Sequence, residues 1–232
     1  MSTALKVLSA GAVKGGVAQL CAAYERASDC KVEVEFTQVP KMKKRIAAGE
    51  EADVLVATGG AMDEFAAAGN IVASTRALLG RSRVGVVVRK DAPAPDVSDT
   101  EAFRRALLAA SAVVHNDASS GVYIASLLEK LGLKALLGDR VIVVNSGAAI
   151  ITTVAERGLG AIGMGQISEI KVMIDKGVAA KFVAPLPDAI QNVSTYYAAA
   201  GTASATPEAA AALVRELTSD AAKKVFAATG ID

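Results

Sequence analysis

The sequence predicts an α/β protein built on parallel β-sheet, and three observations carry this prediction. Apolar strands alternate with helical segments in the order βαβαβ between residues 6 and 57, and βα units recur between residues 84 and 185. The strand at 52–57, ADVLVA, is a nearly continuous apolar run, which is typical of a strand covered on both faces. Hydrophobic residues make up 52% of the 232 residues, so the chain can bury one large core or two lobes of roughly 100 residues each.

The first set of elements follows from periodicity. Apolar residues from about Ala12 onward, such as Val13 and Val17, fall at helical spacing, whereas KVEVEFT at 31–37 alternates as a strand does. Gly69 is a C-cap signal. The set therefore contains a strand at 6–9, a small-residue turn at 9–11, a helix from 12 to 26, a strand at 31–37, a basic helix at 41–48, a strand at 52–57 and a helix through 68.

The second set repeats the pattern and is followed by a C-terminal segment. Asp99 and Ser219 are N-cap residues, and Pro207 suits the first position of a helix. The expected strands lie at 84–89, 112–115, 141–144, 160–164, 180–185 and 193–200. The expected helices lie at 100–110, 121–131, 148–157, 167–175, from 207, and from 220 to Gly230.

Composition narrows the function classes. With 25 basic and 24 acidic residues the net charge is +1, which gives no footprint for nucleic acid. A single histidine excludes a His-rich zinc site, and no apolar run approaches the length of a membrane span. Gly158, Gly160 and Gly163 spell G-x-G-x-x-G, but they follow a helix, so we interpret Gly158 as a C-cap and expect no nucleotide cofactor and no metal.

The two cysteines and the N-terminal residues give information about the cellular compartment of the protein. Cys21 lies on the apolar stripe of the first helix and Cys30 precedes a strand, so the default is two free thiols, with a disulfide left open. The residues MSTALKVLSAG enter the first strand without the three regions of a signal peptide. This predicts a cytoplasmic protein as written, and a periplasmic one if a leader was removed.

The candidate ligand-binding residues lie where strands end and helices begin. In open parallel sheets, ligands bind outside the carboxyl ends of the strands, where backbone N–H groups at helix starts favour an anion. The residues of these loops are small and polar, but residues that only cap helix N-termini are of the same types. The predicted set is Ala10, Gly11, Ala12, Gln38, Lys41, Thr58, Gly59, Ser119, Ser120, Gly121, Ser146, Gly147, Gly165 and Gln166.

Five stretches, spread over nearly the whole chain, match a known family. They are KVLSAGAV…LCAAYE, RIAAGEEADVLVAT, DASSGVYIASLLEKLGL, VAERGLGAIGMGQISEI and PEAAAALVRELTSDAAKKVFAATGI. In them the chain resembles the type II solute-binding proteins, within the molybdate-binding-like branch. The resemblance implies two Rossmann-like lobes, 1–82 with 193–232 and 83–192. It also implies a two-strand hinge near 80–84 and 191–195, an anion in the cleft between the lobes, and, for an exported protein, an ABC transporter permease as partner.

Departures from the family pattern change the expected ligand. Molybdate binders have a Ser in the first loop, a Ser-Gly pair after the second strand and a late Tyr. Here these places hold Ala10–Ala12, Gln38–Lys41 and Gly163–Gln166. Hydroxyl donors are lost while lysines gather at 41, 43 and 44, although those lysines also suit a solvated helix face. A di- or tricarboxylate is therefore expected in preference to molybdate.

Two functions remain open on these residues. One is a non-catalytic binder that closes over its ligand by hinge motion. The other is a cofactor-free isomerase, since some relatives of this branch are similar to aconitate isomerase, which moves an allylic proton. Its base would be His115, with Lys41 as an alternative base or a carboxylate clamp. Glu169 could also reach the cleft, but it suits a helix-cap role equally well. His115 equally suits a hydrogen-bonded strand end. A sensor or interaction module has no positive feature in the sequence.

Overall fold

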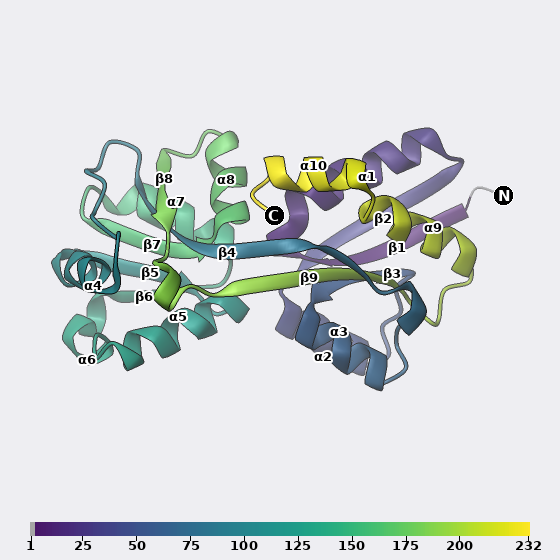
Figure 1. The fold of residues 1–232 in the computed structure, drawn as a ribbon, viewed down its shortest axis with the longest axis horizontal. Helices are drawn as coiled ribbons and strands as arrows, with labels where there is room; N and C mark the ends of the chain where they lie inside the picture. Colours follow the sequence, from purple (N-terminus) through teal and green to yellow (C-terminus); the bar gives the residue numbers. More distant parts are fainter. Residues whose placement is uncertain (1–2) are drawn as a thin grey trace. The chain divides into compact units, whose positions relative to one another are not determined.

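The computed structural model describes residues 3–232 and divides them into two compact units. Unit 1 contains the described residues through Ser82 together with Ser194–Asp232, and unit 2 contains Arg83–Val193. Each unit is a β-sheet covered by helices, so the predicted α/β class is confirmed (Figure 1). Within residues 3–232, every helix is too short or too polar to cross a lipid bilayer.

Unit 1 is built on a sheet with the order β2-β1-β3-β9. β1 pairs in parallel with β2 and with β3, and β9 runs antiparallel to β3. The strands are β1 (Thr3–Ala10), β2 (Cys30–Thr37), β3 (Val54–Thr58) and β9 (Val193–Ala200). The helices are η1 (Gly11–Val13), α1 (Lys14–Ala27), α2 (Val39–Ala47), α3 (Gly59–Ala67), η2 (Ala73–Thr75), α9 (Pro207–Leu217) and α10 (Asp220–Ala228).

The core of unit 1 lies between this sheet and its helices. Leu5, Val7 and Leu55 of the strands are buried together with Leu213 of α9 and Phe226 of α10. α1 packs against both C-terminal helices. A Cβ at Gly16 would lie 2.3 Å from the Phe226 ring, so glycine is what allows α10 to approach α1 this closely.

Unit 2 is built on a sheet with the order β8-β4-β7-β5-β6. β5 pairs in parallel with β6 and β7, whereas β4 is antiparallel to β7 and β8. The strands are β4 (Ala77–Arg89), β5 (Ala112–Asn116), β6 (Val141–Val144), β7 (Ala161–Gln166) and β8 (Ala180–Pro185). The helices are α4 (Thr100–Ala109), α5 (Ser119–Lys130), α6 (Lys134–Leu137), η3 (Gly138–Arg140), α7 (Gly147–Arg157), α8 (Ile167–Asp175) and η4 (Asp188–Ile190).

The two faces of the unit 2 sheet carry separate cores, because side chains alternate along each strand. On β5, Val113 faces a cluster that includes Phe103 of α4 and Ile124 of α5. Its neighbour Val114 faces the other cluster, with Ile150 of α7 and Ile170 of α8. The sheet is therefore sandwiched between helices, as its continuous apolar strands predict.

Several expected boundaries are wrong by a few residues, and α6 was not expected. β1 extends to Ala10 where a turn was predicted, and η1 intervenes before α1 begins at Lys14. α2 begins at Val39 because Pro40 is accommodated in the first turn, where no intrahelical N–H is needed. β4 is 13 residues long and continues through the predicted hinge segment 80–84.

Local signals at other positions are confirmed. Asp99 Oδ1 accepts a bond of 2.8 Å from Ala102 N at the start of α4, and Ser219 caps α10 in the same way. Gly158 ends α7 with φ of +96°, and β7 begins only at Ala161, so the G-x-G-x-x-G sequence is no dinucleotide loop. Cys21 and Cys30 are both free and buried, and burial raises the pKa of the Cys21 thiol to about 12.

Gln191 stabilises unit 2 through its side-chain amide. Its Oε1 accepts bonds of 2.9 Å from the backbone N–H groups of Val84 and Asn192, and its Nε2 donates to the carbonyl oxygens of Val84 and Leu186. We expect Gln191→Leu to lower the free energy of unfolding by about 2–4 kcal/mol, because it removes four hydrogen bonds and takes the side-chain partner from Asn192 N and from the carbonyl oxygen of Leu186. The N–H and carbonyl of Val84 keep their backbone bonds to Asn192 and Leu186. Urea unfolding measures this, with the exposed Gln19→Leu as control. Equal midpoints for the two variants would contradict the assignment.

Candidate functional site

The carboxyl ends of the parallel strands in unit 1 form the first candidate surface, which we call the unit 1 carboxyl edge. β1, β2 and β3 end there, and η1, α2 and α3 begin within two residues of those ends. The first turns of these helices carry no acidic residue, and no side chain caps them. Their N-terminal N–H groups and dipoles therefore favour an anion at this edge. The edge holds the predicted residues Ala10, Gly11, Ala12, Gln38, Lys41, Thr58 and Gly59.

Cationic side chains also lie at this edge. Lys14, the first residue of α1, places its ammonium 5.2 Å from the centre of the Phe36 ring at the end of β2. Lys41 is exposed in the first turn of α2. Lys43 is paired with Glu64, so the lysine cluster predicted around residue 41 is only partly available to a ligand.

Arg76 is a further cation of this edge that the sequence prediction missed. It follows η2, and its Nη2 donates a 3.3 Å bond to the carbonyl oxygen of Gly59 at the start of α3. Its guanidinium carbon lies 4.4 Å from the centre of the Tyr197 ring on β9. No spacing or motif marks Arg76, because its neighbours come from distant parts of the chain.

Three parallel strands of unit 2 end at a second surface, the unit 2 carboxyl edge. β5, β6 and β7 end there and are followed by α5, α7 and α8. Neither α5 nor α7 has an acidic residue in its first turn, and Ser146 Oγ caps α7 by accepting a bond from Ala149 N at 3.2 Å. This edge holds the predicted residues Ser119, Ser120, Gly121, Ser146, Gly147, Gly165 and Gln166.

The position of α5 depends on Gly121. A Cβ at this residue would lie 1.7 Å from the backbone oxygen of Asn116 and 2.5 Å from its side-chain oxygen. Asn116 Oδ1 also accepts a bond of 3.2 Å from Ala118 N. The helix start is therefore pressed against the end of β5, and only glycine allows the approach.

His115 lies in β5 with 4% of its surface exposed. Its Nδ1 is 2.8 Å from the backbone oxygen of Asn116. Since a carbonyl oxygen can only accept, Nδ1 is the nitrogen that carries a proton in this contact. The ring is thus held at the end of the strand by a hydrogen bond, which is the structural role expected for His115. Its predicted role as a catalytic base stays a prediction.

Glu169 is an ionisable group of unit 2 whose pKa is strongly shifted by its surroundings. It lies in the first turn of α8, and its carboxylate packs against Gly147 at the start of α7, where a Cβ would come within 1.9 Å of Oε2. Burial raises the pKa of this carboxyl from 4.5 to about 7. A carboxyl with such a pKa can gain or release a proton near neutral pH.

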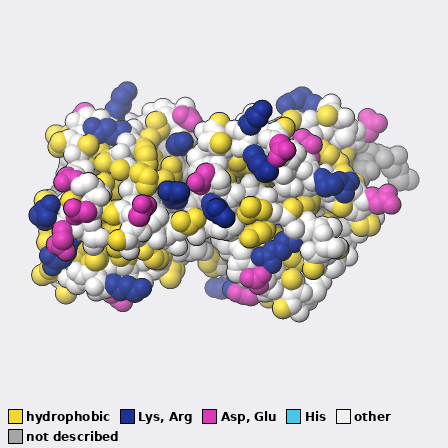
Figure 2. All heavy atoms as spheres, in the orientation of Figure 1, with side chains coloured by type: hydrophobic (Ala, Val, Ile, Leu, Met, Phe, Trp, Pro, Cys, Tyr) yellow, Lys and Arg dark blue, Asp and Glu magenta, His cyan; other side chains and the backbone are white. Residues whose placement is uncertain are grey.

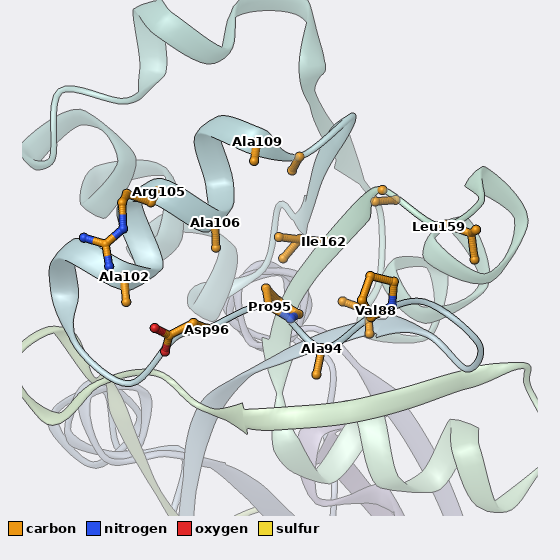
Figure 3. Close-up of a pocket in the computed structure, with 14 residues that line it drawn as sticks. Val88, Ala94, Pro95, Asp96, Ala102, Arg105, Ala106, Ala109, Leu159 and Ile162 are labelled. Carbon is orange, nitrogen blue, oxygen red and sulfur yellow. The ribbon is translucent and has the colours of Figure 1, made fainter.

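Unit 2 also contains a cavity of about 380 Å³ away from its carboxyl edge (Figure 3). It is lined by the last part of β4, the loop after it, α4 and the first residues of β7, including Val88, Pro95, Ala106 and Ile162. Arg105 and Asp96 are its charged lining residues. None of the predicted site residues lines it. Residues 3–232 contain no group of three or more His, Cys, Asp and Glu side chains arranged for a metal ion.

Charged side chains of both signs are interspersed over the face shown in Figure 2. With a net charge of +1, the chain has no strong overall field to attract an anion. Any attraction of an anion to the carboxyl edges therefore depends on local groups, namely helix N-termini and individual cations.

Comparison with known proteins gives three kinds of match. A family model described as bacterial extracellular solute-binding protein matches residues 5–232. An aconitate isomerase of Pseudomonas sp. is 32% identical over 237 residues, which cover 99% of this chain and 87% of that protein.

The solved structures that match share the fold at low sequence identity. The periplasmic molybdate-binding protein of Azotobacter vinelandii superposes with a TM-score of 0.78 at 16% identity, covering 98% of each chain. The sulfate-binding protein of Mycobacterium tuberculosis H37Rv gives 0.77 at 17% identity, covering 99% of this chain and 86% of that one.

Proposed function

The chain belongs to the bacterial extracellular solute-binding protein family, and on that premise we propose that it binds a small organic anion, a di- or tricarboxylate, at its unit 1 carboxyl edge. The expected resemblance to type II solute-binding proteins with a molybdate-binding-like fold is confirmed. The observation that carries the proposal is the convergence of helix N-termini without acidic first turns at the unit 1 carboxyl edge.

Two observations favour a carboxylate over a tetrahedral oxyanion. Lys14, Lys41 and Arg76 lie at the unit 1 carboxyl edge, and the planar fork of an arginine matches the two oxygens of a carboxylate. The relative with 32% identity is named for aconitate, a tricarboxylate. A binder of this kind would deliver its ligand to an ABC transporter permease if it is exported.

The proposal is tested by calorimetric titration with tricarballylate, citrate, succinate, sulfate and molybdate. We expect tricarballylate to bind more tightly than succinate, because each additional carboxylate adds charge-assisted hydrogen bonds. Binding of molybdate or sulfate with no binding of any carboxylate would reject the proposal and favour an oxyanion carrier.

A second candidate is a cofactor-free isomerase of an unsaturated carboxylate such as aconitate. The identity to aconitate isomerase over 99% of the chain favours it. A base would remove an allylic proton, the electrons would move into a dienolate held by hydrogen-bond donors, and the proton would return to the other allylic carbon. We propose Glu169 as this base ahead of His115, since burial raises the pKa of its carboxyl to about 7 and Nδ1 of His115 is already bonded.

Proton NMR in D₂O with cis- and trans-aconitate separates the two candidates. Interconversion of the isomers, or deuterium uptake at the allylic carbons, would establish catalysis. Line broadening of the ligand without chemistry would establish binding alone and remove the isomerase candidate.

A further inference from the structure

We propose that Arg76 is the group by which unit 1 binds a carboxylate of the ligand, and that the Tyr197 ring holds Arg76 in position for this. The proposal deepens the proposed function and rests on it. It names one cation of the unit 1 carboxyl edge as the residue that gives the site its preference for a carboxylate.

The position of Arg76 is fixed by three contacts within unit 1. Nη2 donates to the carbonyl oxygen of Gly59 at 3.3 Å, and the guanidinium lies on the Tyr197 ring with its carbon 4.4 Å from the ring centre. Nη1 is paired with Asp63 of α3. The side chain is 25% exposed, so it is held in place and yet reachable. Lys41, by contrast, is an exposed chain with no such support.

The positive charge of Arg76 is unfavourable to the start of α3. A helix N-terminus carries a partial positive charge, so a cation beside Gly59 is repelled by the helix dipole. Asp63 offsets that repulsion only in part, because its own side chain is 67% exposed and solvent weakens the pair. An anionic group bound beside both the helix start and the guanidinium would remove the repulsion, since both then attract it.

Arg76 also retains hydrogen-bonding capacity. A guanidinium has five N–H donors in a planar fork that matches the two oxygens of a carboxylate. Its hydrogen bonds, to Gly59 and Asp63, use one N–H of each terminal nitrogen, so Nη1 and Nη2 each keep a second N–H. Nε is buried without a partner among residues 3–232, so the terminal nitrogens are the ones that a ligand can reach. A ligand carboxylate would supply acceptors to a group that the protein leaves incompletely bonded.

The experiment measures the dissociation constant of tricarballylate, which has no double bond to isomerise, for wild type and variants by calorimetry. We expect Arg76→Gln to weaken binding about 10- to 100-fold, as the loss of a charged hydrogen bond predicts. Arg76→Lys keeps the charge but loses the fork and should weaken binding at least about fivefold. Tyr197→Leu should weaken binding about threefold, and Tyr197→Phe should have no effect.

Asp63→Asn distinguishes a binding role from a structural one. Removing the competing carboxylate frees Nη1, so a binding arginine should hold tricarballylate more tightly, whereas a structural ion pair would leave the affinity unchanged. The control is Arg26→Gln, an exposed arginine in the last turn of α1, which removes the same charge from the same unit and should bind as wild type does.

The outcomes separate this proposal from the function on which it rests. If wild type binds no carboxylate, the proposed function fails and Arg76 loses its role with it. If wild type binds tricarballylate and both Arg76 variants bind within twofold of it, only the Arg76 assignment is overturned. If Arg76→Gln does not fold, the dissociation constants of tricarballylate for Arg76→Lys and Asp63→Asn test the assignment instead.

Discussion

Replacing Gly121 by Ala is expected to lower the free energy of unfolding by about 3 kcal/mol or more. The new Cβ would meet the backbone oxygen of Asn116 at 1.7 Å, and that atom cannot rotate away as a flexible side chain could. Either the start of α5 or the end of β5 must shift. Urea unfolding followed by circular dichroism measures the loss.

Gly60→Ala is the matched control for this prediction. Gly60 is the second residue of α3, and nothing lies within 4 Å of where its Cβ would be. Since alanine is the better helix former, the control should be as stable as wild type or more stable by up to about 1 kcal/mol. An unfolding midpoint for Gly121→Ala equal to that of Gly60→Ala would contradict the close approach between α5 and β5.

The sequence predicted those features of the fold that local patterns encode. Continuous apolar strands and helical periodicity gave the order of elements, and small residues after strands gave the loops of both carboxyl edges. Boundaries were less accurate where two signals compete, as at Pro40, which can precede a helix or occupy its first turn. The four-residue helix α6 is too short to show a period.

The chemistry of the site was harder to predict, because it depends on contacts between distant residues. Arg76 is a candidate binding residue because it contacts Gly59 and Tyr197. The residues next to Arg76 in the sequence do not indicate either contact. Glu169 is recognisable in the sequence as a carboxylate near a strand end, but the rise in its pKa comes from burial against Gly147 and the surrounding fold. From the sequence alone, a buried Glu169 with a raised pKa cannot be distinguished from an ordinary helix-cap residue.

Glu169→Gln is expected to change the pH dependence of stability in unit 2. The carboxyl has a pKa of 4.5 in the unfolded chain and about 7 in the folded one, so between these values the folded state binds the proton more tightly. Wild-type stability should therefore fall as the pH rises from 4.5 to 7, by about 3 kcal/mol in total from this group. The Gln variant cannot ionise and should lack this fall.

Urea unfolding at pH 5 and pH 8 measures the effect. Glu156→Gln is the control, because Glu156 is exposed on the neighbouring helix α7 and the chemical change is the same. The control should lose as much stability as wild type between the two pH values, and Glu169→Gln should lose about 2.5 kcal/mol less. An equal loss in all three proteins would mean that the Glu169 carboxyl is already ionised at pH 5.

The same substitution tests Glu169 as the base of the proposed isomerase. Only the ionised carboxylate can accept the allylic proton, so kcat/KM for trans-aconitate should rise with pH through about 7 in wild type. Glu169→Gln should reduce turnover about 10²- to 10⁴-fold, because a general base contributes that much, while tricarballylate binding should stay within about threefold. A Gln variant that keeps wild-type turnover would exclude Glu169 from proton transfer and return His115 to first place, with Lys41 as the alternative base.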